Sequence, residues 1–513
     1  MNKFSFIFLV SILFFSCDDS GLDVEVESSI STASYWSSSD DVNAYLYGCY
    51  DDFRDINNST LLFEDRSDAF KPGDIGPTTE AWSQAMDAQS APTLTGMYNA
   101  IYHFNSLYKQ ASNFNFSNSS ERDDILAQAL LMRAHTYFTL VKTFGDTPLL
   151  ISPYEGTGTE IIGRTPKAEV MSQIISDIDN AISLFSSDNI INKNFWSKPA
   201  AFALKADVLL WRGKVLDGGE SDLKMVVEVI DNVESITSLP LLQDYSSIFN
   251  SSNKKNDEII FSLYFDRFES PRQYGSRTKS VLQNVSEAYN KSDLSLTAGN
   301  EARHVYAPSD ELLAIYEKND GDLRKDFNIV YPKIAVSEIE VPVDQYDGSQ
   351  GPNIGLAENG NVRVATESRN LFRMTKKYSG TYYNDIQDYR YDDDTIIYRS
   401  ADLILMRAEA NAGIGNISEA IADLNKIRNR SGISDYNGSQ DKISVENEIL
   451  DERFRELFLE LKRWHDLVRA HEWGSLDIYQ KIPNLVGKSV PLNFPISNSD
   501  IAKNSLLIQN QGY

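Results

Sequence analysis

The sequence predicts a mainly α-helical fold in which pairs of helices of the tetratricopeptide type form a scaffold, with a long loop-rich layer and a few short strands. Two observations predict the scaffold: apolar residues recur at three- and four-residue steps, and paired helical stretches follow one another along the chain. A third observation predicts the loop layer. Between about residues 241 and 400 the helical period is lost, and Gly, Asn, Asp, Ser and Tyr become frequent. The dense aromatic residues there argue against disorder, so we expect a functional loop layer.

The N-terminus reads as an export signal. Lys3 precedes a short apolar stretch, and the small residue Ser16 precedes Cys17. The stretch is too short for a comfortable transmembrane helix and is typical of a secretory signal. We therefore expect a signal peptide over 1–16 and a lipid attached to Cys17, which would anchor the protein without spanning the membrane. Residues 17–35 are polar and are expected to form a flexible tether; an ordinary signal peptide with an incidental cysteine is the alternative.

Helical patterns dominate after the tether. The stretch 121–144 is the clearest, and Gly145 followed by Pro148 ends it. Thr165 and Pro166 form a typical helix start. The next helices are expected at about 166–185, 199–213 and 221–233.

The C-terminal half repeats the paired pattern. Helices are expected at 402–415 and 417–430, with Asn416 and Glu419 as a capping box between them. Any helical hairpin would give a similar pattern. Residues 258–265 are expected to form a strand. We predict that residues 36–513 form a single domain.

Composition excludes several classes of function. The 513 residues carry a formal net charge of −26, which makes nucleic acid an unsuitable partner because phosphate binding needs a basic surface. The acidic body would also be repelled by anionic lipid headgroups, so the acyl chain is the only anchor we expect. If Cys17 is acylated, Cys49 has no partner for a disulfide and is expected to be a small buried residue.

No catalytic motif is evident in the sequence. It lacks a glycine-rich phosphate loop, a nucleophile elbow and an HExxH pair. The five histidines show no metal-ligand spacing, and His135 and His465 are expected to be packed within helices. The acidic run Tyr391-Asp392-Asp393-Asp394 is interpreted as a solvated turn. A pair of carboxylates for glycoside hydrolysis could still lie among so many acidic residues, so a secreted hydrolase stays open at this point.

Several segments, taken in order, resemble the SusD/RagB family of outer-membrane nutrient-binding lipoproteins of the Bacteroidetes. They are Arg133–Leu149, Ala200–Gly213, Tyr398–Ala410, Leu424–Arg430, Asp451–Leu457, Glu460–Arg469 and Phe494–Tyr513. Leu461 departs from the family pattern, which usually has Gly there, as do Ser497 and Gln511, where Pro is frequent. These three positions affect local turns rather than membership.

The resemblance implies a binding role rather than catalysis, with no cofactor and no metal. Such proteins sit as a lid on a SusC-like TonB-dependent outer-membrane transporter and pass it a glycan or, in some members, a peptide. The protein would then be lipid-anchored in the outer membrane and would face the cell exterior, as the acidic Asp18 and Asp19 after Cys17 also suggest. A repeat scaffold that binds only proteins is the remaining alternative. The charged residues of the signature segments are expected to form buried ion pairs and caps: Arg399, Asp402, Glu409, Arg463 and Asp466.

Aromatic residues in loops are the candidates for ligand contact, since sugar rings stack their apolar C–H faces on aromatic rings while a few polar groups orient them. The irregular segments at about 55–95 and 241–400 are expected to face the ligand. The first supplies Asp68, Phe70 and Trp82. The second supplies four more candidates just after the expected strand: Tyr264, Phe268, Arg272 and Tyr274.

Overall fold

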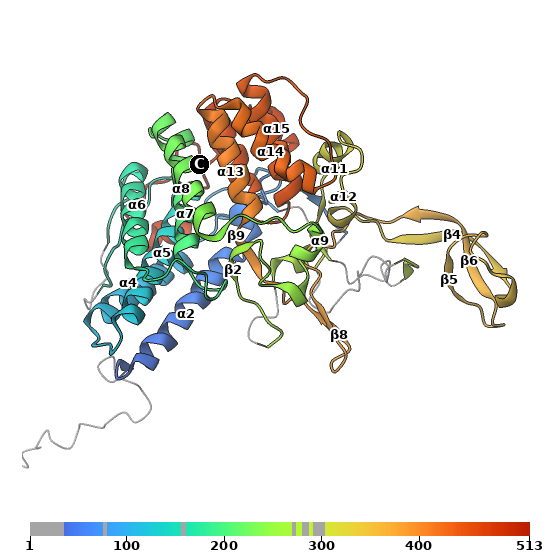
Figure 1. The fold of residues 1–513 in the computed structure, drawn as a ribbon, viewed down its shortest axis with the longest axis horizontal. Coiled ribbons are helices and arrows are strands. Elements are labelled where there is room, and N and C mark those ends of the chain that lie inside the picture. The colour runs from blue at the N-terminus through green and yellow to red at the C-terminus, as the bar shows by residue number, and fades with distance from the viewer. Residues whose placement is uncertain (1–34, 75–78, 155–160, 269–272, 280–286, 291–302) are drawn as a thin grey trace, which may run out of the picture.

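A computed structural model describes residues 35–74, 79–154, 161–268, 273–279, 287–290 and 303–513. Cys17, the signal segment and most of the tether lie outside the described residues, as does Arg272. The expected mainly helical fold is confirmed (Figure 1).

The long helices pack on one another in chain order. They are α2 (Ser39–Asn57), α4 (Thr95–Asn113), α5 (Ser119–Phe144), α6 (Lys167–Leu184), α7 (Lys198–Val215), α8 (Gly219–Thr237), α13 (Ser400–Gly413), α14 (Ile417–Arg430), α15 (Lys442–Leu457) and α16 (Arg463–Trp473). Helices α4 to α8 each contact the next, α8 contacts α13, and α13 contacts both α14 and α15. The helical pairs therefore join into one continuous scaffold.

Helix ends follow the signals in the sequence in most places. Gly145 ends α5 with a φ of 79°, a left-handed value that glycine adopts without strain. The capping box predicted at Asn416 is wrong, because the Asn416 side chain makes no capping hydrogen bond and donates instead to Asn411 Oδ1 at 3.2 Å. The preceding turn, which begins at Gly415, brings the two asparagine side chains together.

Short elements fill the rest of the body. The short helices are α3 (Thr60–Phe63), α9 (Tyr245–Ile248), α11 (Asp310–Glu317), α12 (Lys325–Asn328), α17 (Ile478–Lys481) and α18 (Asn498–Lys503). Within the described residues, three two-stranded antiparallel sheets pair β1 (Phe70–Pro72) with β3 (Tyr306–Pro308), β2 (Ile259–Leu263) with β9 (Thr395–Arg399), and β7 (Thr381–Tyr383) with β8 (Asp388–Arg390). The strand expected at 258–265 is confirmed as β2.

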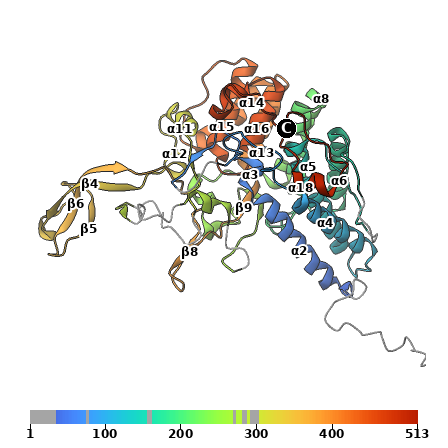
Figure 2. The same cartoon turned by 180° about the vertical axis from the view of Figure 1, so that it is seen from behind.

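The region expected to be irregular at residues 337–369 is instead largely a sheet. Strands β4 (Lys333–Val341), β6 (Val362–Asn370) and β5 (Asn353–Leu356) form an antiparallel sheet in the order β4-β6-β5. We call residues 333–370 the β arm, since both views show it projecting away from the helical body (Figures 1 and 2). It has a small apolar cluster of its own, made by Val341, Val362 and Val364 with Tyr346 against them.

The main apolar core joins both halves of the chain, and residues from Val42 to Leu507 contribute to it. The expected buried ion pairs are also confirmed. Arg399 is fully buried and contacts the carboxylates of Glu258, Glu456 and Glu460 at 2.6–2.8 Å. The other expected residues form buried pairs as well: Asp402 and Asp466 with Arg453, Glu409 with Arg469, and Arg463 with Asp68.

Candidate functional site

The outer face of helix α2, which carries an exposed tyrosine and a glycine, borders an open cavity. The apolar stripe of this helix, which includes Val42, Leu46 and Phe53, is buried against the body. The opposite stripe carries Tyr47, which is 59% exposed, and Gly48. A Cβ atom added to Gly48 would meet no atom within 4 Å. A glycine inside a helix costs about 1 kcal/mol relative to alanine, and here it leaves the space beside the helix open.

The cavity has a volume of about 700 Å³, a size typical of small-molecule sites. Helix α2 forms one wall, and segments distant in the sequence form the others. The lining residues are Ala44, Tyr47, Gly48, Tyr50, Asp51, Arg54, Asn192, Asn194, Phe195, Lys255, Leu263 and Tyr264.

Aromatic rings form the apolar part of the cavity. Phe195 packs edge-on against Tyr50 and Tyr47, with ring centroids 4.8 and 5.7 Å apart. Tyr264 follows the end of β2 and is 42% exposed. Tyr47 and Tyr264 therefore offer accessible ring surface at the same cavity.

Polar groups stand beside these rings. Arg54 donates to Asp51 on the same helix and to the Tyr264 carbonyl oxygen at 3.2 Å, so it ties α2 to the segment after β2. Lys255 donates to Asn192 Oδ1 at 3.0 Å. An aromatic cavity with a few placed carboxylate, guanidinium, amide and ammonium groups suits a polar ligand that also has apolar faces.

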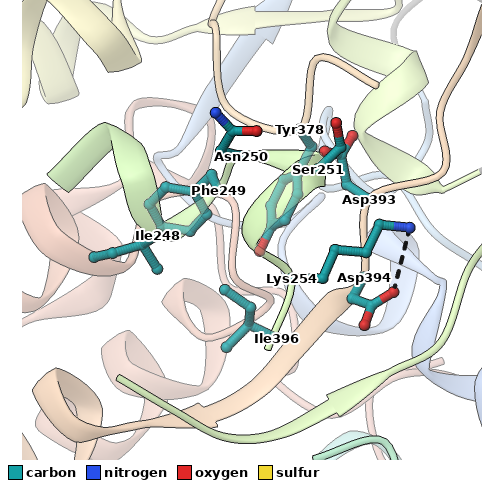
Figure 3. A pocket seen from close by; sticks show the side chains of 9 residues that line it. All are labelled: Ile248, Phe249, Asn250, Ser251, Lys254, Tyr378, Asp393, Asp394 and Ile396. Carbon is teal, nitrogen blue, oxygen red and sulfur yellow. Dashed lines mark ion pairs between the residues drawn. The ribbon is translucent and has the colours of Figure 1, made fainter. Parts of the chain in front are cut away.

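A buried carboxylate holds the segment that carries Tyr264. Asp394 accepts from the Phe265 amide at 3.1 Å and from the Asn194 side chain at 2.7 Å. Figure 3 shows Lys254 reaching towards Asp394, with Nζ and Oδ1 3.8 Å apart, at a second pocket of about 10 Å³. That pocket has room for about one water and is too small for a sugar. Asp394, which lines this small pocket, holds Asn194 and the segment after Tyr264 in the wall of the larger cavity.

The interpretation of Tyr391–Asp394 as a solvated turn is wrong. All four residues are buried, because their side chains and backbone serve as anchors for neighbouring loops. Asp393 accepts from the Gly380 amide at 2.7 Å, and burial raises its pKa to about 7.

The ligand candidates that belong to the second irregular segment lie in different surroundings. Tyr264 lines the cavity, and Phe268 is 77% exposed four residues later. Tyr274 is buried and its hydroxyl donates to the Leu459 carbonyl oxygen at 2.5 Å.

The candidates from the first segment lie away from the cavity. Asp68 is buried and pairs with Arg463 at 2.7 Å, and Phe70 is buried and stacks on Tyr306. Trp82 is partly buried and donates to the Phe70 carbonyl oxygen at 2.9 Å. Their side chains stabilise the fold around β1, so we leave them out of the site proposed below.

Sequence reasoning missed Tyr47, Asp51 and Arg54 on α2. A signal was present, since Tyr47 and Gly48 fall on the helix face opposite the apolar stripe of Val42 and Leu46. The positions at 192–195 carried no comparable signal.

Within the described residues, no group of three His, Cys, Asp or Glu side chains is placed to hold a metal ion. The same part of the chain contains no helix with the length and hydropathy to cross a membrane.

Comparison with known proteins gives the family. Residues 242–513 match the family model described as "SusD family", and residues 22–210 match a model described as "Starch-binding associating with outer membrane". The chain belongs to the SusD family, a class of binding proteins, and this membership associates it with the outer membrane.

Relatives cover the whole chain. SusD-like protein P25 of Formosa agariphila is 24% identical, with 100% of this chain and 99% of that protein aligned. A SusD superfamily protein of Bacteroides fragilis has the same fold, with a TM-score of 0.78, 22% identity and coverage of 93% and 100% of the two chains. A solved structure titled "Laminarin binding SusD-like protein" aligns with a TM-score of 0.69, 21% identity and coverage of 92% and 99%.

Proposed function

We propose that this protein captures a glycan in the cavity beside α2 and delivers it to a SusC-like TonB-dependent transporter in the outer membrane, where a lipid on Cys17 holds it at the cell exterior. The observation that carries the binding part is the pair of accessible rings, Tyr47 and Tyr264, at one cavity of about 700 Å³ that also holds charged and amide groups. Two structural neighbours whose titles name laminarin or glycan binding support the ligand class.

The cavity is better suited to binding than to hydrolysis. Glycoside hydrolysis normally uses two carboxyl groups that flank the scissile bond. Among the described residues that line the cavity, Asp51 is the only carboxylate, and Arg54 is hydrogen-bonded to it.

Calorimetry tests the ligand class. The unlipidated chain from Asp18 onward would be titrated with laminarin, starch, other polysaccharides and a peptide mixture. We expect heat with one glycan class. Heat with peptides alone would instead assign the protein to the peptide-binding members of the family, and no heat with any member of the panel would overturn the proposal for the isolated protein.

A substitution that fills the cavity tests whether the glycan binds there. Gly48→Leu places a side chain in the open space beside α2 and removes a helix-weakening glycine, so we expect a folded protein with at least about tenfold weaker glycan binding, or about 1.4 kcal/mol. Tyr264→Ala should cost about 1–3 kcal/mol of binding free energy. Gly96→Leu is the matched control, because Gly96 is also an exposed helix residue with nothing within 4 Å of an added Cβ, and it lines a different pocket. Unchanged affinity in Gly48→Leu would place the site elsewhere.

A further inference from the structure

An exposed aromatic residue stands four residues after Tyr264, which lines the cavity, and contacts a neighbouring guanidinium. Phe268 is 77% exposed, and single exposed apolar residues are ordinary. This one, however, is packed against the Arg267 guanidinium, whose central carbon lies 4.4 Å from the Phe268 ring centroid. The same guanidinium lies 4.5 Å from the ring centroid of Tyr383 on β7.

Arg267 also ties this segment to the β7–β8 hairpin. Its two terminal nitrogens donate to both oxygens of Asp385 at 2.9 and 2.8 Å, a bidentate geometry that fixes orientation as well as distance. Tyr383 in turn donates to buried Asp392 at 2.7 Å. We call Phe268, Arg267, Tyr383 and Asp385 the Phe268 platform.

One carboxylate joins this platform to the cavity. Asp266 accepts from the Tyr264 hydroxyl at 3.0 Å and from the Phe268 amide at 2.8 Å. The Cα atoms of Tyr264 and Phe268 are at most about 14 Å apart, since four residues of extended chain span no more. A ligand that stacks on Tyr264 and continues outward therefore reaches Phe268 within a few sugar units.

We propose that the Phe268 platform is a second saccharide-binding position, which takes units of the same glycan chain where the chain leaves the cavity. An accessible ring beside a guanidinium and a carboxylate offers both the stacking surface and the polar groups that a sugar ring uses. This inference rests on the proposed glycan-binding function, and it adds that the ligand is a chain longer than the cavity.

The hairpin supplies a matched control. Tyr382 is 41% exposed and neighbours Tyr383 on β7, so its side chain points to the opposite face of the hairpin. There it packs on Tyr389, with ring centroids 5.1 Å apart. Tyr382→Ala therefore removes an exposed ring from the hairpin that Arg267 contacts, but not from the platform.

The test uses oligosaccharides of graded length, cut from the polysaccharide of the panel that the wild-type protein binds. In wild type, affinity should rise with chain length and then level off. Phe268→Ala should lower the affinity for the longest oligosaccharides about tenfold, the scale of one interface anchor, and leave the shortest ones unchanged. Tyr382→Ala should behave as wild type at every length.

The outcomes separate the two proposals. Long-chain affinity that is unchanged in Phe268→Ala, or that falls equally at all lengths, overturns the platform and leaves the cavity standing. Absence of binding to every polysaccharide overturns both. Thermal unfolding of Phe268→Ala checks that the variant folds, as expected for a residue so exposed.

Discussion

Arg399 illustrates how single charged residues are accommodated in the interior. It is fully buried, and its guanidinium meets Glu258, Glu456 and Glu460. Removal of one member of such a network leaves unpaired buried charge, which typically costs several kcal/mol. Leu461, next to Glu460 of this network, has a φ of 61°, in the left-handed region that favours glycine. The Leu461 amide donates to the Glu64 carboxylate at 2.8 Å. Burial raises the pKa of Glu64 to about 8.

Asp393 gives a pH-dependent prediction at the same scale. Burial raises its pKa to about 7 from the 3.8 of an unperturbed aspartate. The folded state therefore holds a proton that the unfolded state has lost between about pH 4 and 7, so stability falls as pH rises through this window. The cost is about 1.4 kcal/mol for each pH unit between the two values.

Asp393→Asn removes this titration and keeps an acceptor for the Gly380 amide. We expect the variant to gain stability over wild type progressively from pH 5 to about pH 7 and to level off above it, with a gain of a few kcal/mol at most. Urea unfolding at several pH values measures the difference. Asp344→Asn, an exposed residue of the β arm, controls for the change in net charge. A difference that is constant with pH, or that grows towards acid, would contradict the prediction.

At the scale of elements, the β arm differs most from the rest of the molecule. Valine or isoleucine alternates with charged residues at Ile339–Val341 of β4 and Val362–Val364 of β6, and Arg363 pairs with Glu338 across the sheet at 2.6 Å. Its apolar cluster is separate from the main core. The arm is therefore a small unit that stabilises itself and is joined to the body at the base of β4 and β6.

Removal of the arm should leave the body folded. Replacement of residues 337–366 with a short Gly/Ser turn keeps the pairing of Lys333 with Asn370 at the base. We expect the thermal midpoint to change by no more than about 2 °C, which corresponds to about 2 kcal/mol, because an unfolding entropy of about 2.1 cal/mol/K per residue makes each degree worth about 1 kcal/mol in a protein of this size. Circular dichroism gives the midpoint. Val364→Asp, which disrupts the arm's own cluster, should likewise spare the body; loss of the main transition in either variant would show that the arm supports the core.

Sequence reasoning recovered the parts of the molecule that local pattern determines. Helices such as α5 follow from apolar periodicity, and the buried role of Arg399 and Arg463 followed from the family resemblance. The cavity was only partly found because residues 44–54, 192–195 and 255–264 meet in space with no local signal of their meeting. Phe70 and Phe268 look alike in sequence, since both stand in charged segments, yet one is buried and the other is 77% exposed.

At the scale of the whole molecule, distant segments close the fold. Arg66 donates to the carbonyl oxygens of Leu492 and Pro491 at 2.7 and 2.8 Å, and the Phe494 amide donates to the Thr143 carbonyl oxygen at 2.8 Å. Arg463 reaches Asp68 across nearly 400 residues of sequence. We therefore propose that residues 36–513 fold as one domain, with the tether and the anchor outside it.

The anchor gives the last prediction. The acidic body, with a net charge of −26 for the full chain, is repelled by anionic lipid surfaces, so membrane attachment should depend on the acyl chain at Cys17. In native cells, Cys17→Ser should move the protein from the membrane fraction to the soluble fraction. Wild type, extracted in mild detergent, should bring down a protein of transporter size that the variant does not retain. Cys49→Ser is the control, because Cys49 is buried in α2 and cannot carry a lipid without unfolding. Two results would contradict this prediction: release of the wild type from the membrane by a high-salt wash, or a Cys17→Ser variant that stays on the membrane. Either would show that charge or protein contacts, rather than the lipid, hold the molecule there.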